Sequence, residues 1–205
     1  SGIAVRTSGQ ATQRPILRGY SGDRFLITSD NFELGDMSNS TADHAVSLEI
    51  SSAESIELIR GPETLVYGSN TVAGIINILT PAYKQQKLDN PSYKLLMGHE
   101  SSNQSNLLSA NINVPLKSYQ FFTAYTKRVS NDQSSPLGNL ENTALIKDDI
   151  TFAITKFRQK NYSTLQVKSF EMDYGIPGSP EGHIDGVDLK LKNLSQKLLY
   201  HHDIS

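Results

Sequence analysis

The chain contains no cysteine among its 205 residues, so it has neither a disulfide framework nor a thiolate metal site. It also lacks tryptophan. Its apolar runs all fall well short of the ~18 residues that a membrane-spanning helix needs, and the longest, Val72–Leu79, has the length of a strand. If the chain meets a bilayer, we expect it to do so with barrel strands, because only helices and closed barrels satisfy the backbone in lipid.

A strong positive charge is also absent. The formal net charge is −2 and no Lys/Arg-rich run occurs, so the sequence predicts no nucleic-acid partner. The sequence carries no dinucleotide-binding glycine motif, P-loop, H-E-x-x-H or G-x-S-x-G pattern, so we do not expect an enzyme. The first residues, Ser1–Arg6, read as a strand rather than a signal peptide, and we expect the chain to be a piece of a longer protein at both ends.

The most informative stretch that is present runs from Asp43 to Pro81. Its pattern predicts a short strand at Ser55–Ile59, which Arg60-Gly61-Pro62 ends. Proline suits the first turn of a helix, and Glu63 follows it at the positive end of the helix dipole, so Glu63–Tyr67 is predicted to be a short helix or turn. After Gly68-Ser69-Asn70, the run Val72–Leu79 is predicted to be a buried strand.

Three shorter strands are predicted upstream, at Ile3–Arg6, Arg14–Gly19 and Phe25–Ile27. The last is followed by Asp30-Asn31, which we expect to form a turn because Asn tolerates the left-handed conformation. Many folds contain such elements. A polar linker is predicted at 83–91.

Beyond the linker, segments of about ten residues alternate between polar and apolar positions, which is typical of transmembrane barrel strands. Short connections at 115–118 and 158–161 alternate with long ones at 130–142 and 175–186, as in outer-membrane barrels. A soluble meander with one wet face shows the same alternation, and the pattern alone leaves both open. Residues 92–205 are thus predicted to supply about six antiparallel strands: Tyr93–Glu100, Asn106–Val114, Tyr119–Val129, Ile150–Phe157, Tyr162–Tyr174 and Val187–Tyr200.

The residue pattern of the central stretch, Asp43–Pro81, resembles that of the plug domain of TonB-dependent outer-membrane receptors. In that family a segment of the form IE-x-I-RGP is followed by YGS-x-A and GG-x-INI-x-T. Here Thr71 and Ala73 replace a small residue and the first of the two glycines. The resemblance marks a set of structural plug residues: Arg18, Gly19, Glu57, Arg60, Gly61, Pro62, Tyr67, Gly68, Gly74 and Asn77.

The resemblance implies an α+β plug domain over residues 1–82, of which the last two-thirds are present, followed by the first six antiparallel strands of an incomplete barrel. Full barrels of the family have about 22 strands. It implies localisation in the outer membrane of a Gram-negative bacterium, contact with outer-membrane lipid, and energy-coupled uptake of a scarce nutrient. The partner would be the TonB–ExbB–ExbD complex, reached through a segment N-terminal to the plug. Charges at Arg18, Glu57 and Arg60 are expected to hold the plug in the lumen.

Within the family, the sequence is most similar to the zinc and metal receptors. Asp43-His44-Ala45 resembles a D-H-A motif of that branch, and a carboxylate beside an imidazole suits Zn²⁺, although a closed site needs four ligands. The segment starting at Tyr174 resembles an external loop of the same branch, in which Glu181, His183 and Asp185 are weaker candidate ligands. Zinc is therefore expected as a transported ion, and no resident cofactor is expected. The alternatives are a siderophore or vitamin receptor and, in another class, a soluble all-β binding or adhesion module.

Overall fold

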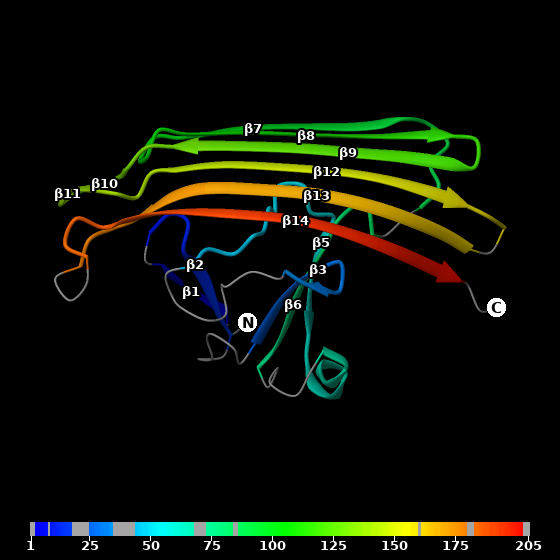
Figure 1. Cartoon of the computed structure of the whole chain (residues 1–205), viewed down its shortest axis with the longest axis horizontal. Helices are drawn as coiled ribbons and strands as arrows, with labels where there is room; N and C mark the ends of the chain where they lie inside the picture. The colour runs from blue at the N-terminus through cyan, green and yellow to red at the C-terminus, as the bar shows by residue number, and fades with distance from the viewer. Residues whose placement is uncertain are drawn as a thin grey trace.

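The computed structural model places a small N-terminal unit against one face of a long antiparallel sheet (Figure 1). We use "N-terminal unit" for the described residues up to Tyr83. No described helix has both the length and the apolar character needed to cross a membrane. The structure describes residues 3–7, 9–17, 25–34, 44–67, 73–83, 86–159, 161–179 and 183–202.

The N-terminal unit contains a mixed sheet in the order β4-β3-β6-β5. Strands β3 (Phe25–Ser29) and β6 (Gly74–Leu79) pair in parallel, and β5 (Ser55–Ile59) pairs with β6 antiparallel. Central strand β6 is buried along almost its whole length, as its continuous apolar run predicts. The other elements are the 3₁₀-helix η2 (Gly61–Tyr67), β4 (Phe32–Glu33), and a separate pair formed by β1 (Ile3–Thr7) and β2 (Gln13–Leu17).

The predicted turns of this unit are confirmed by the backbone. Asp30 and Asn31 have φ values of 55° and 64° and join β3 to β4, as a two-residue turn with two left-handed positions requires. Gly61 and Gly74 have φ values of 78° and 129°, where a side chain would be strained. Pro62 lies in the first turn of η2, the position that its missing amide hydrogen favours.

The long sheet is a meander in which each strand pairs with the next in sequence. Strands β7 and β14 are its two edges, so these six strands do not close on themselves. The strands are β7 (Ser92–Glu100), β8 (Ser105–Leu116), β9 (Tyr119–Ser130), β12 (Leu145–Phe157), β13 (Asn161–Ile176) and β14 (Val187–His202).

Two features of the long sheet differ from the sequence prediction. Strand β12 begins at Leu145, five residues before the predicted start at Ile150. The polar Lys147-Asp148-Asp149 segment is part of this strand, and each of its side chains has an ion-pair partner in the fold. The predicted loop 130–142 also contains a short hairpin, formed by β10 (Gln133–Ser135) and β11 (Gly138–Leu140).

The two faces of the long sheet have opposite character. The face toward the N-terminal unit buries small polar side chains, and two hydroxyl pairs, Ser109–Thr126 and Thr155–Thr164, hydrogen-bond across its strands at 2.7 and 2.8 Å. We call it the inner face. The outer face leaves large apolar side chains in the open, such as Phe152, which is 59% exposed. Exposing so many large apolar side chains to water would cost free energy, whereas the same side chains suit contact with lipid.

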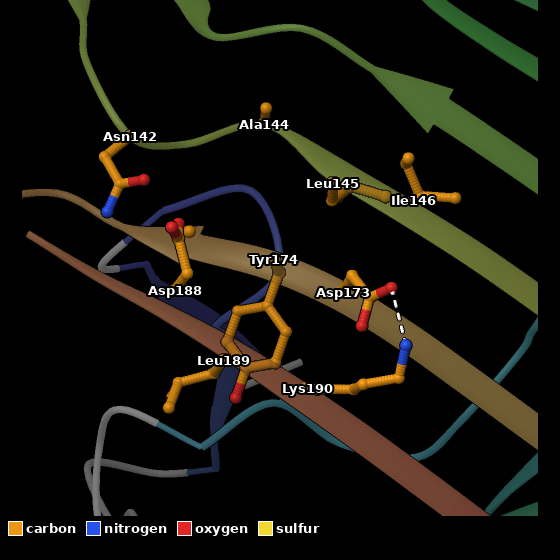
Figure 2. Close-up of a pocket in the computed structure, with 10 residues that line it drawn as sticks. Asn142, Ala144, Leu145, Ile146, Asp173, Tyr174, Asp188, Leu189 and Lys190 are labelled. Atoms are coloured by element: carbon orange, nitrogen blue, oxygen red, sulfur yellow. Dashed lines mark hydrogen bonds and ion pairs between the residues drawn. The ribbon is translucent and has the colours of Figure 1, made fainter.

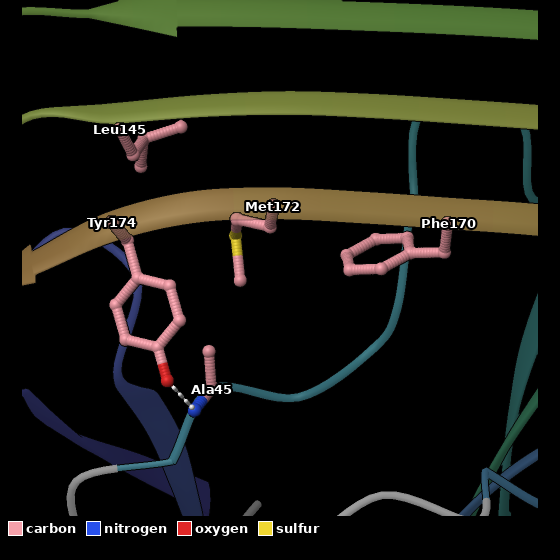
Figure 3. Close-up of a cluster of buried hydrophobic side chains, with 5 residues drawn as sticks. All are labelled: Ala45, Leu145, Phe170, Met172 and Tyr174. Carbon is pink, nitrogen blue, oxygen red and sulfur yellow. Dashed lines mark hydrogen bonds between the residues drawn. The ribbon is translucent and has the colours of Figure 1, made fainter. Parts of the chain in front are cut away.

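The main apolar contact between the two parts is a cluster under the ends of β12 and β13 (Figure 3). Phe170, Met172 and Tyr174 extend from β13 toward Ala45 of the N-terminal unit, and Leu145 of β12 completes the cluster. The amide of Ala45 donates a hydrogen bond to the Tyr174 hydroxyl at 3.1 Å. Burial of this cluster therefore fixes the segment that follows His44 against the sheet.

Candidate functional site: the interface between the N-terminal unit and the sheet

A buried ion pair joins the N-terminal unit to β12. Lys147 Nζ lies 2.5 Å from Glu49 Oε2, and the side chains are 15% and 2% exposed. The Ser51 amide donates to Glu49 Oε1 at 2.7 Å. Burial raises the pKa of Glu49, but the Lys147 ammonium ion and the hydrogen bonds from Lys147 and Ser51 outweigh burial and hold this pKa below its ordinary value. Glu49 is thus an anion that depends on Lys147.

A second buried contact joins the β3–β4 turn to β14. Lys197 Nζ donates to the Ser29 carbonyl at 2.8 Å and lies 3.5 Å from Asp30 Oδ2. The Asp30 side chain is fully buried and also accepts hydrogen bonds from the Thr80 amide, at 2.8 Å, and the Thr80 hydroxyl, at 3.1 Å. Asp30 therefore ties together the β3–β4 turn, the end of β6 and the sheet.

The loop between β1 and β2 makes a third contact, at the end of the sheet where the long connections lie. Gln10 Nε2 donates to the Asn131 carbonyl, and Asn103 Nδ2 donates to Gln10 Oε1, both at 2.7 Å. A Cβ added to Gly9 would lie 3.5 Å from Pro177. This loop therefore contacts the connections that follow β7, β9 and β13.

A hydrogen-bond network inside the N-terminal unit explains several of the motif residues. Asn77 is fully buried; its Oδ1 accepts from Thr28 Oγ1 and the Asn31 amide, and its Nδ2 donates to Asn31 Oδ1 and Glu57 Oε2, all at 2.7 to 3.2 Å. Tyr67 donates its hydroxyl to Asn31 Oδ1 at 2.8 Å. Burial, helped by Tyr83 and Glu57, raises the pKa of Tyr67, so this hydroxyl stays a donor. Asn31 Nδ2 in turn donates to the Tyr83 hydroxyl.

The charged motif residues are placed differently. Glu57 and Arg60 are both exposed; Glu57 accepts the hydrogen bond from Asn77, and Arg60 lies just before η2. Within the ranges that the structure describes, neither forms an ion pair with the six strands. Their expected role in holding the unit in a lumen stays a prediction, as does that of Arg18, which lies outside the described residues together with Gly19 and Gly68.

Three of the five candidate metal ligands lie among the described residues. Asp43 and Glu181 lie outside the described residues. His44 is half-buried immediately before Ala45, while His183 and Asp185 lie in the connection between β13 and β14. Both segments are at the end of the sheet where the long connections lie. The residues that the structure describes form no group of three or more potential ligands, so the metal site stays a prediction.

A pocket of about 350 Å³ lies at the same end of β12, β13 and β14 (Figure 2). Asn142, Gly175 and Lys190 are among its lining residues, and Lys190 pairs with Asp173 at 3.0 Å. Asn142 Nδ2 donates to the Ile176 carbonyl at 2.8 Å. A Cβ on Gly175 would lie 2.6 Å from the Asn142 carbonyl oxygen, and one on Gly186 would lie 2.4 Å from Asn142 Nδ2. The two glycines therefore make room for Asn142, which joins two long connections.

We expect Gly175→Ala to separate these connections, because the added methyl group would collide with the Asn142 backbone rather than with a flexible side-chain end. Limited proteolysis of the full receptor should then cut faster between residues 131 and 144. Gly98→Ala is the matched control, since its Cβ would meet Leu107 at an ordinary 3.6 Å. Equal cutting rates for the two variants would contradict the proposed role of Gly175.

Sequence reasoning missed the residues that join the two parts, namely Glu49, Lys147 and Lys197, and the role of Asp30 beyond its turn. One signal could have found the lysines. Each lies in phase with the inward-facing positions of its strand, where a lysine needs a partner.

Comparison with solved structures defines the class of protein. The chain superposes on a copper transporter, OprC (TM-score 0.77, 17% identity, 96% of this chain and 30% of that one). It also superposes on the FrpB iron transporter of Neisseria meningitidis (0.76, 14%, 98% and 34%) and on the siderophore receptor PirA of Acinetobacter baumannii (0.74, 15%, 100% and 34%). The chain therefore has the fold of about one third of a plugged outer-membrane receptor.

The family match is more specific for the N-terminal unit. Residues 1–75 match the model of the TonB-dependent Receptor Plug Domain. Residues 1–75 thus match a plug domain, and the whole chain has the fold of a plug followed by the opening strands of a barrel, which confirms the predicted fold class. The match to the plug model assigns the chain, like the receptors with this fold, to the outer membrane of Gram-negative bacteria.

Proposed function

We propose that this chain belongs to a receptor that imports a metal-containing nutrient across the outer membrane with energy from the TonB–ExbB–ExbD complex. The observation that carries the proposal is a plug domain docked on the inner face of barrel-type strands through buried ion pairs. A soluble all-β module would rarely expose an apolar outer face of this kind to water. The names of the three similar structures, a copper transporter, an iron transporter and a siderophore receptor, support a metal-containing cargo.

The proposal includes a division of the chain into a plug over residues 1–82, a linker at 83–91 and barrel strands over 92–205. Movement of the plug away from the inner face would open a path along the sheet. Because Glu49–Lys147 and Asp30–Lys197 connect the two parts, this movement must break both pairs. Energy supplied through TonB is therefore needed to pull the plug away from the sheet and break these ion pairs.

Two forms of cargo fit the proposal. The first is a free metal ion such as Zn²⁺, for which Asp43 and His44 would supply a carboxylate and an imidazole on the plug. Support for it comes from the D-H-A motif and from the position of His44 at the end of the sheet with the long connections. The second is a metal chelate of the siderophore type, which the name of the similar siderophore receptor supports.

Zinc titration of the full receptor tests the first form. If the cargo is the free ion, Asp43→Ala and His44→Ala should each weaken zinc binding at least about tenfold, since even outer-shell substitutions cost that much. His202→Ala, at the other end of the sheet, is the matched control. Unchanged affinity in both variants would remove the zinc site. Uptake of ⁶⁵Zn²⁺ that is equal in cells with and without TonB would remove energy-coupled zinc import.

A further inference from the structure

The linker between the plug and the sheet is fastened to the inner face. A free linker over 83–91 could extend to about 30 Å, which would let the end of the plug move that far from β7. Gln120, an inner-face residue of β9 that is 2% exposed, prevents this. Its Oε1 accepts a hydrogen bond from the Leu88 amide at 2.9 Å, and its Nε2 donates to the Gln86 carbonyl at 3.3 Å. One buried side chain therefore binds the linker backbone both as acceptor and as donor.

A second attachment lies where the plug ends and the linker begins. Ala82 is fully buried and packs in a cluster with Phe122 and Ala124 of β9 and Ala153 of β12. All three partners occupy inner-face positions of their strands. The Tyr83 carbonyl, the next along the chain, lies within 3.5 Å of the Tyr162 hydroxyl. The last residues of the plug are thus fixed to the wall before the linker starts.

These attachments are confined to one end of the interface. Gln120 is the second residue of β9, close to the short connection between β8 and β9. Lys147, the partner of Glu49, precedes Ala153 by six residues on β12, which corresponds to about 20 Å along the strand. The apolar cluster around Ala45 lies farther still toward the long connections. The plug is therefore attached at the short-connection end, while single side-chain contacts hold the rest.

We infer that the plug remains attached to the wall at Ala82 and rotates about residues 80–83 when it opens, so that the path widens from the long-connection end. The inference rests on the proposed function and specifies how the plug moves. The Tyr83 amide donates to the Thr80 carbonyl at 3.0 Å, so the rotation centres on a tight turn. Gln120 is a positioning residue, because it moves the attachment point from the start of β7 back to the end of the plug.

Such a rotation displaces the two buried ion pairs unequally. The strand register places Lys197 in the same row as Ala153, through Gln166 of β13. Asp30 therefore docks in the row of the attachment, whereas Glu49 docks about 20 Å away along the strands. The Glu49–Lys147 pair and the contacts of Ala45 are the ones that separate most.

Two buried alanines test the inference in the full receptor. Ala45→Cys and Ala82→Cys place the same thiol at positions that are 1% and 0% exposed, in a chain that has no other cysteine. Cells with and without TonB would be treated with a small maleimide. We expect TonB to raise the labelling rate at position 45 at least about fivefold, because local opening exposes it, and to leave position 82 protected. An equal rise at both positions would overturn the inference.

A glutamine substitution tests the attachment itself. Adding Gln120→Ala to the Ala82→Cys receptor frees the linker and should allow TonB-dependent labelling at position 82. Gln166→Ala is the matched control, since Gln166 is equally buried on the inner face and its Oε1 has no hydrogen-bond partner among the described residues. Equal labelling of position 82 in the two variants would show that Gln120 does not fix the linker.

Hydrogen exchange separates failure of the inference from failure of the proposed function, because it needs neither TonB nor cargo. The reporters are the Leu88 amide, bound to Gln120, and the Ala45 amide, bound to Tyr174. As urea is added to the full receptor, Ala45 should lose protection first, and Gln120→Ala should speed exchange at Leu88 about tenfold. Simultaneous loss at both amides overturns the inference even if transport is intact. The expected order without any TonB-dependent labelling at position 45 counts against the proposed function alone.

Discussion

Replacing Lys147 with Met should weaken the docking of the plug by about 3 kcal/mol. The substitution leaves Glu49, which is 2% exposed, without its counter-ion, and an uncompensated buried charge is among the largest single penalties in a folded protein. The free energy of plug release can be measured in the full receptor by hydrogen exchange of plug amides against urea concentration.

The matched control is Lys127→Met. Lys127 also pairs with an aspartate, Asp148, but at 3.3 Å on the outer face, where the two side chains are 45% and 35% exposed. A pair this exposed contributes about 1 kcal/mol or less. Equal losses in the two variants would contradict the importance assigned to burial. The double variant Lys147→Met/Glu49→Leu should recover most of the loss, because apolar side chains can replace a buried ion pair at little cost.

The effect of Lys147→Met should also depend on pH. In the native receptor the pKa of Glu49 lies below its ordinary value, so Glu49 contributes stability above the pKa of an unfolded glutamate and loses it as the pH falls through the native pKa. Without Lys147 the effect of burial remains and raises that pKa. The penalty of the variant is then full at neutral pH and shrinks under acidic conditions. A penalty that grows as the pH falls would contradict this account.

Replacing Asn77 with Ala should lower the free energy of unfolding of the plug sheet by about 3 to 5 kcal/mol. Four hydrogen bonds end at this side chain, and its loss leaves the buried Thr28 hydroxyl and the half-buried Asn31 amide short of partners inside the unit. Each buried polar group left unsatisfied costs roughly 1–3 kcal/mol. The measurement is again amide exchange, read at β3 and β6.

Asn113→Ala serves as the matched control on the inner face of β8. The Asn113 Oδ1 atom is buried but has no hydrogen-bond partner, so its removal should cost far less than that of Asn77. If both substitutions destabilised their surroundings equally, the network around Asn77 and Asn31 would not be the reason for the stability of the plug sheet.

Local elements of the fold could be predicted from the sequence because short-range chemistry specifies them. The turn at Asp30-Asn31, the helix that begins near Pro62 and the strand Ser55–Ile59 each depend on a few neighbouring residues. The meander was predictable for a related reason, since alternation along a strand records which face is buried. The family resemblance rested on the ordered motifs around Gly61 and Asn77, and the family match supports it.

What the sequence determined by itself was therefore the kind of structure: a small plug-type domain followed by strands with one apolar face. The tertiary structure alone decided which charges meet. Glu49 and Lys147 are far apart in the chain, as are Asp30 and Lys197, and no local pattern pairs them. Such contacts depend on how two separately patterned parts are docked, because an ion pair is fixed by distance and burial rather than by spacing along the chain.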